Sequence, residues 1–438
     1  MQLVAYGAQD IYLTGNPQIT FFKVVYRRHT NFSIEAIQQT FEQSSDNLFS
    51  GGRKTLLISR NGDLVYKMWL ECKLQCKEGF FGVTPSFTYL NWTNNTGHAL
   101  IEECSIKIGG QQMDKHSSRW LDIWNELTDH EESEWLGLNK HSAKNAYLKS
   151  HPSLPLYDTG DTGKLKLYIP LQFWFNRNVG LALPLIALQY HEVELEVKFR
   201  EISALINTDF GGDITPTADN SSINVKAFAD YIYLDTDERR RFAQVSHEYL
   251  IEQLQYKENE TPKNNHKINF NHPVKELIWV MPNKEYGAKY NSSSKIIDAT
   301  NNSDHGNDYF NYNASFNDGF IEYISGQKSY EAFNRCTIKL NGHIRFKERD
   351  ASYFRICQPQ QVGHKIPSKH IYMYSFSLNP EEHQPSGTCN FSRLDNAHLS
   401  FNELNDSSNP SKYNINVYAL NYNVLRIMSG MGALAYSN

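Results

Sequence analysis

Apolar and polar residues alternate with a period of two along much of this chain. From Leu64 to Leu74 every second residue is apolar or aromatic, while Lys67, Glu71 and Lys73 take positions between them. The stretch from Val193 to Phe199 alternates in the same way with glutamates and a lysine. Successive side chains of a β-strand point to opposite faces, so this pattern is typical of half-buried strands with one wet face. The alternation predicts an all-β chain.

Glycine-containing turns and two short helical patterns separate these strands. The segment from Ser117 to Leu127 carries tryptophans and leucines at helical spacing, and Asp237 is placed to cap a short helix that runs to about Gln244. Because glycine adopts positive φ at little steric cost, three dipeptides are predicted to form tight hairpins: Asn61-Gly62, Gly109-Gly110 and Asn341-Gly342.

Two short sequences recur in the same order in both halves of the chain. Cys104–Gly110 resembles Cys336–Gly342, and Ile223–Ala227 resembles Ile415–Ala419. Each match is short, but their common order suggests that one β-domain has been duplicated. The boundary between the copies is then expected near residues 236–241.

Charge and composition limit the class of protein. The 438 residues carry a formal net charge of −5, and 40% of them are hydrophobic, which favours packed globular domains. The longest basic run, Arg239-Arg240-Arg241, lies among acidic residues, so direct coating of nucleic acid is not expected. The sequence has no apolar run long enough to span a membrane and no secretory signal at Met1, so we expect a protein made in the cytosol.

Residues that could carry chemistry are sparse. Asp129–Glu132 and Glu381-Glu382-His383 hold carboxylates beside a histidine, but adjacent residues do not easily converge on one ion or face each other across a cleft. Six cysteines lack the paired spacing of a zinc site and are expected to be ordinary thiols. We predict no catalytic residue, no metal and no cofactor, and interpret Glu381–His383 as a structural turn between Pro380 and Pro385.

Ten asparagines head an Asn-x-Ser/Thr sequon. Three of them lie in a segment, residues 283–319, that is rich in Asn, Ser, Asp and Gly and is expected to form a long surface loop. These three are the predicted sites of covalent glycans: Asn291, Asn301 and Asn313.

Two longer motifs at opposite ends of the chain point to a family. Tyr374–Arg393 (YSFSLNPEEHQPSGTCNFSR) resembles the C-terminal signature of the major capsid proteins of large nucleocytoplasmic double-stranded DNA viruses, especially those of algae and amoebae. Gln2–Asp10, Leu13–Phe22 and Tyr26–Arg28 resemble the N-terminal block of the same family. The two matches occur in the family's order, so the resemblance covers the whole chain.

The resemblance implies two consecutive eight-stranded antiparallel jelly rolls, with a few short helices in loops and linker. We expect an N-terminal arm over residues 1–20, a first roll over 21–236 and a second over 237–438, with a linker helix at about 237–247. The expected function is that of a structural major capsid protein rather than an enzyme. Three copies would form a pseudo-hexagonal capsomer that tiles an icosahedral shell.

The resemblance also implies partners and a location. We expect contacts with other copies of the chain, with minor capsid proteins beneath the shell and with covalent glycans, in the outer shell of a virion assembled from protein made in the host cytoplasm. The aromatic segments Phe173–Phe175 and Trp120–Trp124 are candidates for the interface between copies, and burial in the core is the equal alternative. A carbohydrate-binding or carbohydrate-active β-sandwich, and a minor capsid or spike protein, remain alternative functions.

Overall fold

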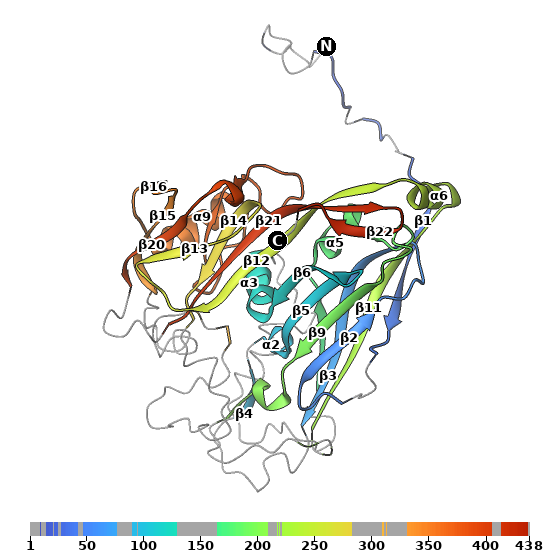
Figure 1. Ribbon diagram of the computed structural model, residues 1–438, viewed down its shortest axis with the longest axis horizontal. Helices are drawn as coiled ribbons and strands as arrows, with labels where there is room; N and C mark the ends of the chain where they lie inside the picture. Colours follow the sequence, from blue (N-terminus) through green and yellow to red (C-terminus); the bar gives the residue numbers. More distant parts are fainter. Residues whose placement is uncertain are drawn as a thin grey trace, which may run out of the picture.

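The computed structural model describes residues 9, 15–20, 22–24, 28–42, 47–76, 90–93, 95–128, 164–208, 217, 219, 221–282, 309–310, 312, 331–404 and 413–436. Figure 1 shows two β-sandwiches side by side, one from each half of the chain, with the N-terminal segment standing off the body. In that segment Ile19, Phe22 and Val24 are 74%, 97% and 72% exposed.

The first sandwich consists of two facing antiparallel sheets. One sheet has the order β1 (Phe32–Gln39), β11 (Ser221–Leu234), β3 (Leu64–Cys76), β7 (Lys164–Pro170), with β8 (Leu183–Pro184) also paired to β3. The other has the order β2 (Gly52–Leu57), β9 (Val193–Phe199), β5 (Ile101–Ile108), β6 (Gln111–Ser117). A separate short pair joins β4 (Leu90–Trp92) to β10 (Ile206–Thr208).

The second sandwich repeats this arrangement. Its first sheet has the order β12 (His247–Glu260), β21 (Ile415–Met428), β14 (Pro273–Val280), β18 (Tyr372–Ser375), extended by β19 (Cys389–Asn390) and β22 (Met431–Leu434). Its second sheet has the order β13 (Asn265–Ile268), β20 (Ala397–Leu404), β15 (Phe333–Leu340), β16 (His343–Ile344), with β17 (Arg349–Asp350) paired to β15.

The two sandwiches have the same topology. If the eight main strands of each are counted along the chain, both give sheets of order 1-8-3-6 and 2-7-4-5. The recurring sequences fall at equivalent places, because Cys104 and Cys336 lie in the fourth strands, β5 and β15, and Ile223 and Ile415 lie in the eighth, β11 and β21. The predicted fold of two consecutive jelly rolls is confirmed. A jelly roll leaves few exposed strand edges, and each roll has room for its own core.

Short helices fill the connections: α2 (Thr96–Leu100), α3 (Ser118–Thr128), α5 (Trp174–Arg177), α6 (Thr236–Gln244) and α9 (Gln358–Gln361), with single turns at Val179–Leu181, Ile202–Leu205, Tyr353–Cys357 and Phe391–Arg393. The helix predicted from Ser117 is α3. The predicted cap of α6 was wrong by two positions, because Asp235 accepts the backbone N–H of Thr236 at 2.8 Å. Asp237 and Glu238 instead lie in the first turn, where negative charge is favoured.

Two of the three predicted hairpins are present. Gly109 and Gly110 join β5 to β6 with φ of +58° and +79°, and Asn341 and Gly342 join β15 to β16 with φ of +51° and +78°. The prediction at Asn61-Gly62 was wrong, because the strands on its two sides lie in different sheets: β2 pairs with β9 and β3 with β11. The connection crosses from one sheet to the other.

Adding a methyl group at Gly109 is expected to destabilise the first roll more than the same change at Gly110. A Cβ on Gly109 would lie 2.5 Å from the imidazole of His191, whereas a Cβ on Gly110 meets nothing within 4 Å. Both positions carry the backbone penalty of positive φ, about 1–2 kcal/mol, so Gly110→Ala is the matched control. Urea unfolding of Gly109→Ala and Gly110→Ala checks this, and equal losses of unfolding free energy would contradict it.

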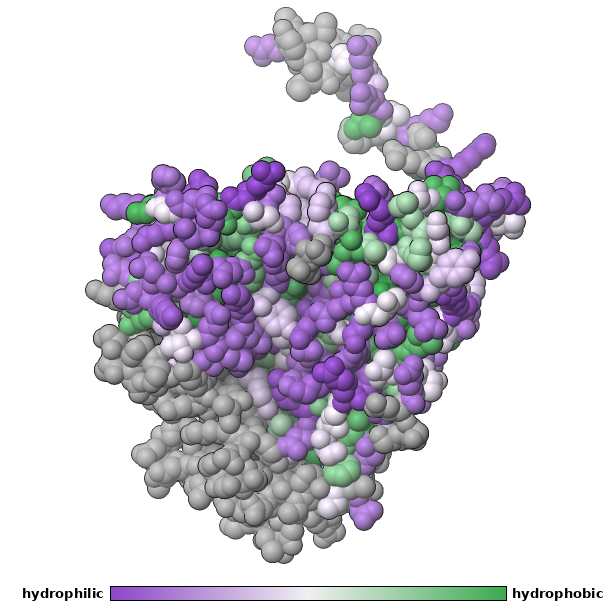
Figure 2. All heavy atoms as spheres, in the orientation of Figure 1, coloured by the Kyte–Doolittle hydropathy of each residue, from purple (hydrophilic) through white to green (hydrophobic). Residues whose placement is uncertain are grey.

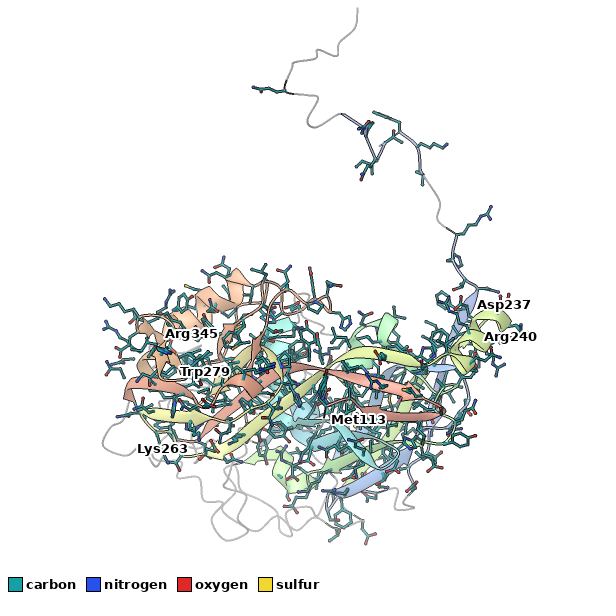
Figure 3. All side chains as sticks on the ribbon, turned by 45° about the horizontal axis from the view of Figure 1, so that its top comes forward. Met113, Asp237, Arg240, Lys263, Trp279 and Arg345 are labelled. Carbon is teal, nitrogen blue, oxygen red and sulfur yellow. The ribbon has the colours of Figure 1, made fainter. Side chains whose placement is uncertain are left out.

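The two rolls meet along a continuous apolar surface. One cluster of buried residues runs from the core of the first roll into strands of the second, where it includes Ile278, Ile371 and Tyr418. A separate cluster fills the second roll, with Trp279 fully buried between Phe354 and Tyr372. Figure 3 places Trp279 inside the second roll and Met113 where the two rolls meet. Among the described residues, each roll therefore has a core, and the two rolls share an internal contact surface, called the junction below.

Candidate functional site

The aromatic segments proposed as an interface between copies lie instead inside one chain. Phe173, Trp174 and Phe175 are at most 2% exposed, and Trp120 and Trp124 are 2% and 5% exposed. The prediction of an inter-copy interface at these residues was therefore wrong, and the alternative of core residues is confirmed. Their side chains have almost no surface to offer a second molecule.

Helix α3 and β6 of the first roll bring these and other groups against the second. Trp120 packs on Tyr418 of β21 with ring centroids 5.6 Å apart. The backbone N–H of Leu254 in β12 donates to the carboxylate of Asp114 at 3.1 Å, and the Gln253 side chain donates to the carbonyl of Met113. The two rolls are thus joined by apolar packing and by directional hydrogen bonds, which together fix their mutual orientation.

A β-bulge places two charged residues in this junction. The register between β14 and β21 shifts between Val274 and Glu276. Alternation along a regular strand would point Lys275 and Glu276 to opposite faces, and a bulge re-aims one of them. Both residues are 0% exposed. Burying a charge costs several kcal/mol unless it is paired, so each must have partners of opposite charge.

Lys275 has its partners in the second roll, and one of them also reaches the first roll. Its Nζ lies 2.6 Å from the carboxylate of Glu252 and 5.1 Å from the ring centroid of Tyr422. Arg177 of α5, in the first roll, binds the other oxygen of Glu252 at 3.1 Å. One carboxylate of β12 therefore joins a cation of each roll.

His364 bridges the second pair of carboxylates. Its Nε2 lies 3.0 Å from Glu276 and its Nδ1 lies 2.7 Å from Glu381. The imidazole contacts Trp124 of the first roll edge-on, with centroids 6.3 Å apart. Burial by itself lowers the pKa of His364, but the charges of both glutamates and its hydrogen bonds to them outweigh burial and raise the pKa from 6.5 to about 9. His364 is therefore a cation at neutral pH.

The Glu381-Glu382-His383 segment contacts both His364 and Lys275. It lies between β18 and β19, and besides the Glu381 contact, the backbone carbonyl of Glu382 accepts from Lys275 at 3.3 Å. With His364 protonated, three carboxylates (Glu252, Glu276 and Glu381) balance three cations (Arg177, Lys275 and His364). We name these six residues the ionic network. The sequence predicted a structural turn here, and the structure adds that the turn is held by buried charges.

Alkaline pH is expected to weaken the junction. The folded pKa of His364, about 9, lies above its ordinary value of 6.5. Its stabilising contribution is therefore complete below pH 6.5 and is lost as the pH rises through 9, on the order of 3 kcal/mol in all. Melting temperatures measured from pH 6 to pH 10 should fall over this window in the natural chain. The control, His364→Gln, should lose this dependence, and an unchanged pH profile in that variant would contradict the assignment.

A second buried cluster lies around Asp122, in the middle of α3. The carboxylate of Asp122 receives the Lys369 ammonium at 2.5 Å, the Asn95 amide at 2.9 Å and the Tyr312 hydroxyl at 3.0 Å. Lys369 belongs to the second roll and Asp122 to the first, so this cluster also spans the junction. Glu126, one helical turn later, accepts from the hydroxyl of Ser368 at 2.9 Å.

The sequence contained one signal for these charges that the prediction missed. In β14 (PVKELIWV) a lysine and a glutamate interrupt a run that is otherwise apolar. The partners of those two residues lie up to 107 residues away along the chain, so only the folded structure shows the ionic network.

The structure does not describe the other predicted site residues. Asn291, Asn301 and Asn313, and the segment Asp129–Glu132, lie outside the described residues. Within the part of the chain that the structure describes, no group of three or more His, Cys, Asp or Glu side chains could hold a metal ion. Among the same residues, no helix combines the length and the apolar character needed to cross a membrane.

Known proteins resemble the chain over both halves. Residues 20–235 match a family described as "Major capsid protein N-terminus", and residues 238–433 match "Large eukaryotic DNA virus major capsid protein". A "Major capsid protein" of Pyramimonas orientalis virus is 44% identical, covering 100% of this chain and 99% of the relative.

Solved structures agree with the sequence matches. The structure titled "PBCV-1 virus capsid, quasi-atomic model" is similar with a TM-score of 0.70 and 34% identity, covering 96% of this chain and 100% of that one. The "Faustovirus major capsid protein" has a TM-score of 0.66 at 12% identity, covering 97% and 94%, and supports the fold alone.

Proposed function

Because this chain belongs to the major capsid proteins of large eukaryotic DNA viruses, we propose that three copies close around a threefold axis into a pseudo-hexagonal capsomer. Like its relatives, the chain is a structural protein of the virion capsid and not an enzyme. The capsomers would tile the facets of an icosahedral shell.

One observation carries the proposal: each chain holds two rolls of identical strand order, fixed to each other by a buried junction. Three chains then present six similar wedges, which is what a nearly hexagonal tile requires. Closure around a threefold axis needs a heterologous contact, in which the first roll of one copy meets the second roll of its neighbour. A junction that did not fix the angle between rolls could not produce a closed ring.

The limits of the two domains are part of the same proposal. We propose that residues 21–236 and 237–438 form the two rolls, with residues 1–20 as an arm. The two family matches meet between residues 235 and 238, at the start of α6, which supports this division. The exposed apolar residues Ile19, Phe22 and Val24 would be covered in the shell, and minor capsid proteins beneath it are the proposed partners of the arm. Synthesis in the host cytoplasm is part of the same proposal.

Electron microscopy of the purified protein tests the capsomer directly. Class averages of negatively stained particles should show hexagonal outlines with threefold symmetry. Particles with the outline of one pair of rolls, at protein concentrations where the sample stays folded, would contradict the proposal.

Glycans are expected at Asn291, Asn301 and Asn313 in protein taken from virions. The support is their sequons in a segment rich in Asn, Ser and Asp, a composition typical of surface loops. Mass spectrometry of peptides from virions should find these asparagines carrying sugar, with Asn390 unmodified as the internal control, since its side chain accepts the backbone N–H of Ser392 at 3.0 Å. Unmodified peptides at all three positions would contradict the prediction.

A further inference from the structure

The buried cluster around Asp122 of α3 contains the groups that amide-bond formation needs. Asp122 lies on α3 of the first roll with its side chain 1% exposed, and Lys369 lies just before β18 of the second roll. The Nζ of Lys369 is 2.5 Å from Oδ1 of Asp122. A nucleophilic nitrogen and a carboxyl carbon are therefore held next to each other by two separate rolls, 247 positions apart along the chain.

Two donors are aimed at the oxygens of that carboxyl group. The Asn95 amide donates to Oδ1 at 2.9 Å, and the Tyr312 hydroxyl donates to Oδ2 at 3.0 Å. Negative charge develops on an oxygen of the carboxyl group when an amine attacks its carbon, and fixed donors at that oxygen stabilise it. Asn95 and Tyr312 are placed for this role before any reaction begins.

His98 holds the Asn95 amide in place. Its Nδ1 lies 2.8 Å from Nδ2 of Asn95, and its ring is buried. Burial, helped by the charge of Lys369, lowers the pKa of His98 to about 3, so at neutral pH the ring is uncharged and can accept from Asn95. The Asn95 amide can therefore donate one hydrogen to His98 and the other to Asp122.

The surroundings favour the uncharged forms of the reacting pair. The Nζ of Lys369 lies 5.2 Å from the ring centroid of Phe310 and 5.9 Å from that of Tyr312. Burial is the main influence on Asp122 and raises its pKa, opposed by the charge of Lys369. Transfer of one proton from the ammonium to the carboxylate leaves an amine and a carboxylic acid, which a site of low polarity tolerates better than two charges.

We propose that Lys369 and Asp122 form an intramolecular isopeptide bond that joins the two rolls covalently. The lone pair of Nζ attacks Cγ of the Asp122 carboxylic acid, and an N–C bond forms while one C–O bond breaks. The amine loses a proton, the leaving hydroxyl gains one, and a single water molecule departs. No electron is gained or lost, so no oxidant or reductant is required.

Glu126 is the proton carrier of this reaction. It follows Asp122 by one helical turn, which puts both carboxyl groups on the same face of α3, and it is 4% exposed. Its Oε2 accepts from the hydroxyl of Ser368, the residue before Lys369. Burial is the main cause that raises the pKa of Asp122, and the charge of Glu126 adds to it. Glu126 therefore lies near the reacting carboxyl group and is hydrogen-bonded to the residue before the reacting lysine.

The mass of the denatured natural chain tests the proposal. Protein that has folded is expected to weigh less than its sequence by one water molecule, and after protease digestion the peptides that contain Asp122 and Lys369 should appear as one branched product. The folded protein is measured both as purified and from assembled shells. Full sequence mass in both samples would overturn the proposal.

Two variants separate the bond from the ion pair. Lys369→Arg keeps the positive charge but cannot form this amide, and it should show the full sequence mass. Glu126→Gln keeps the neighbouring contacts but cannot carry the proton, so it should fold, as judged by circular dichroism, and also keep the full mass. If both the natural chain and the Lys369→Arg variant weigh one water molecule less than their sequences, the linkage lies elsewhere. That result would overturn this assignment.

Discussion

Lys275→Met is expected to lower the free energy of unfolding by about 3–5 kcal/mol, because it leaves a net negative charge in a buried network. Lys275 is 0% exposed, and its partner Glu252 has a side chain that is only 8% exposed. Without the lysine, three carboxylates, of which Glu252 and Glu276 are buried, face two cations. Arg177 still contacts Glu252 and His364 still contacts Glu276, but the network then holds one more negative charge than positive charges. Urea unfolding followed by tryptophan fluorescence measures the loss.

A surface pair provides the matched control for Lys275. Arg335 and Asp350 form an ion pair at 3.1 Å, with side chains 59% and 70% exposed. Exposed pairs contribute about 0–1 kcal/mol, so Arg335→Met should change the stability by no more than that. If Lys275→Met and Arg335→Met lower the free energy of unfolding by similar amounts, burial of the ionic network does not increase its contribution to stability.

Trp120→Ala is expected to uncouple the two rolls as well as to destabilise the chain by about 3–5 kcal/mol. The Trp120 ring is 2% exposed and packs on Trp124 and on Tyr418 of the second roll, with centroids 5.4 and 5.6 Å apart. Removing it opens a cavity in the junction. Scanning calorimetry should then show two transitions, one for each roll.

The control for Trp120 is the same change in the core of one roll. Trp279 is fully buried between Phe354 and Tyr372, away from the first roll. Trp279→Ala should therefore lower the stability by a similar amount while the rolls still unfold together in one transition. A single transition in Trp120→Ala would contradict the assignment of Trp120 to the contact that couples them.

Local features of the chain could be predicted because they depend on near neighbours. The alternation from Leu64 corresponds to β3, and the alternation from Val193 corresponds to β9. The glycine pair at Gly109-Gly110 forms its turn through backbone freedom alone. Asn61-Gly62 failed for the opposite reason: whether a turn joins paired strands depends on which sheet each strand enters, and this is decided by distant residues.

The pairing of strands could be predicted only in part. The repeats around Cys104 and Cys336 correctly indicated a duplicated domain, since they occupy equivalent strands. Neither repeat indicates that β1 pairs with β11, although these strands lie at opposite ends of the first roll's sequence. The resemblance to a family, carried by the motifs at the two ends of the chain, implied two jelly rolls but gave no pairing of particular strands.

The junction could not be predicted from the sequence. His364 and Glu276 are 88 positions apart, and their contact exists because a bulge in β14 redirects two charged side chains. The aromatic segments at Trp120 and Phe173 looked equally suited to an interface between copies and to a core. In the folded chain Trp120 packs on Tyr418 of the second roll, whereas Phe173 stacks on His116 inside the first roll. Figure 2 shows a mainly hydrophilic outer face over the described residues, in keeping with this burial.

The solution mass of the purified protein tests the central claim most directly. Light scattering coupled to size exclusion should give a species of three times 50.6 kDa, the mass of three chains, because the proposed threefold ring satisfies both rolls of every copy. A well-folded monomer that persists at high protein concentration would contradict the capsomer.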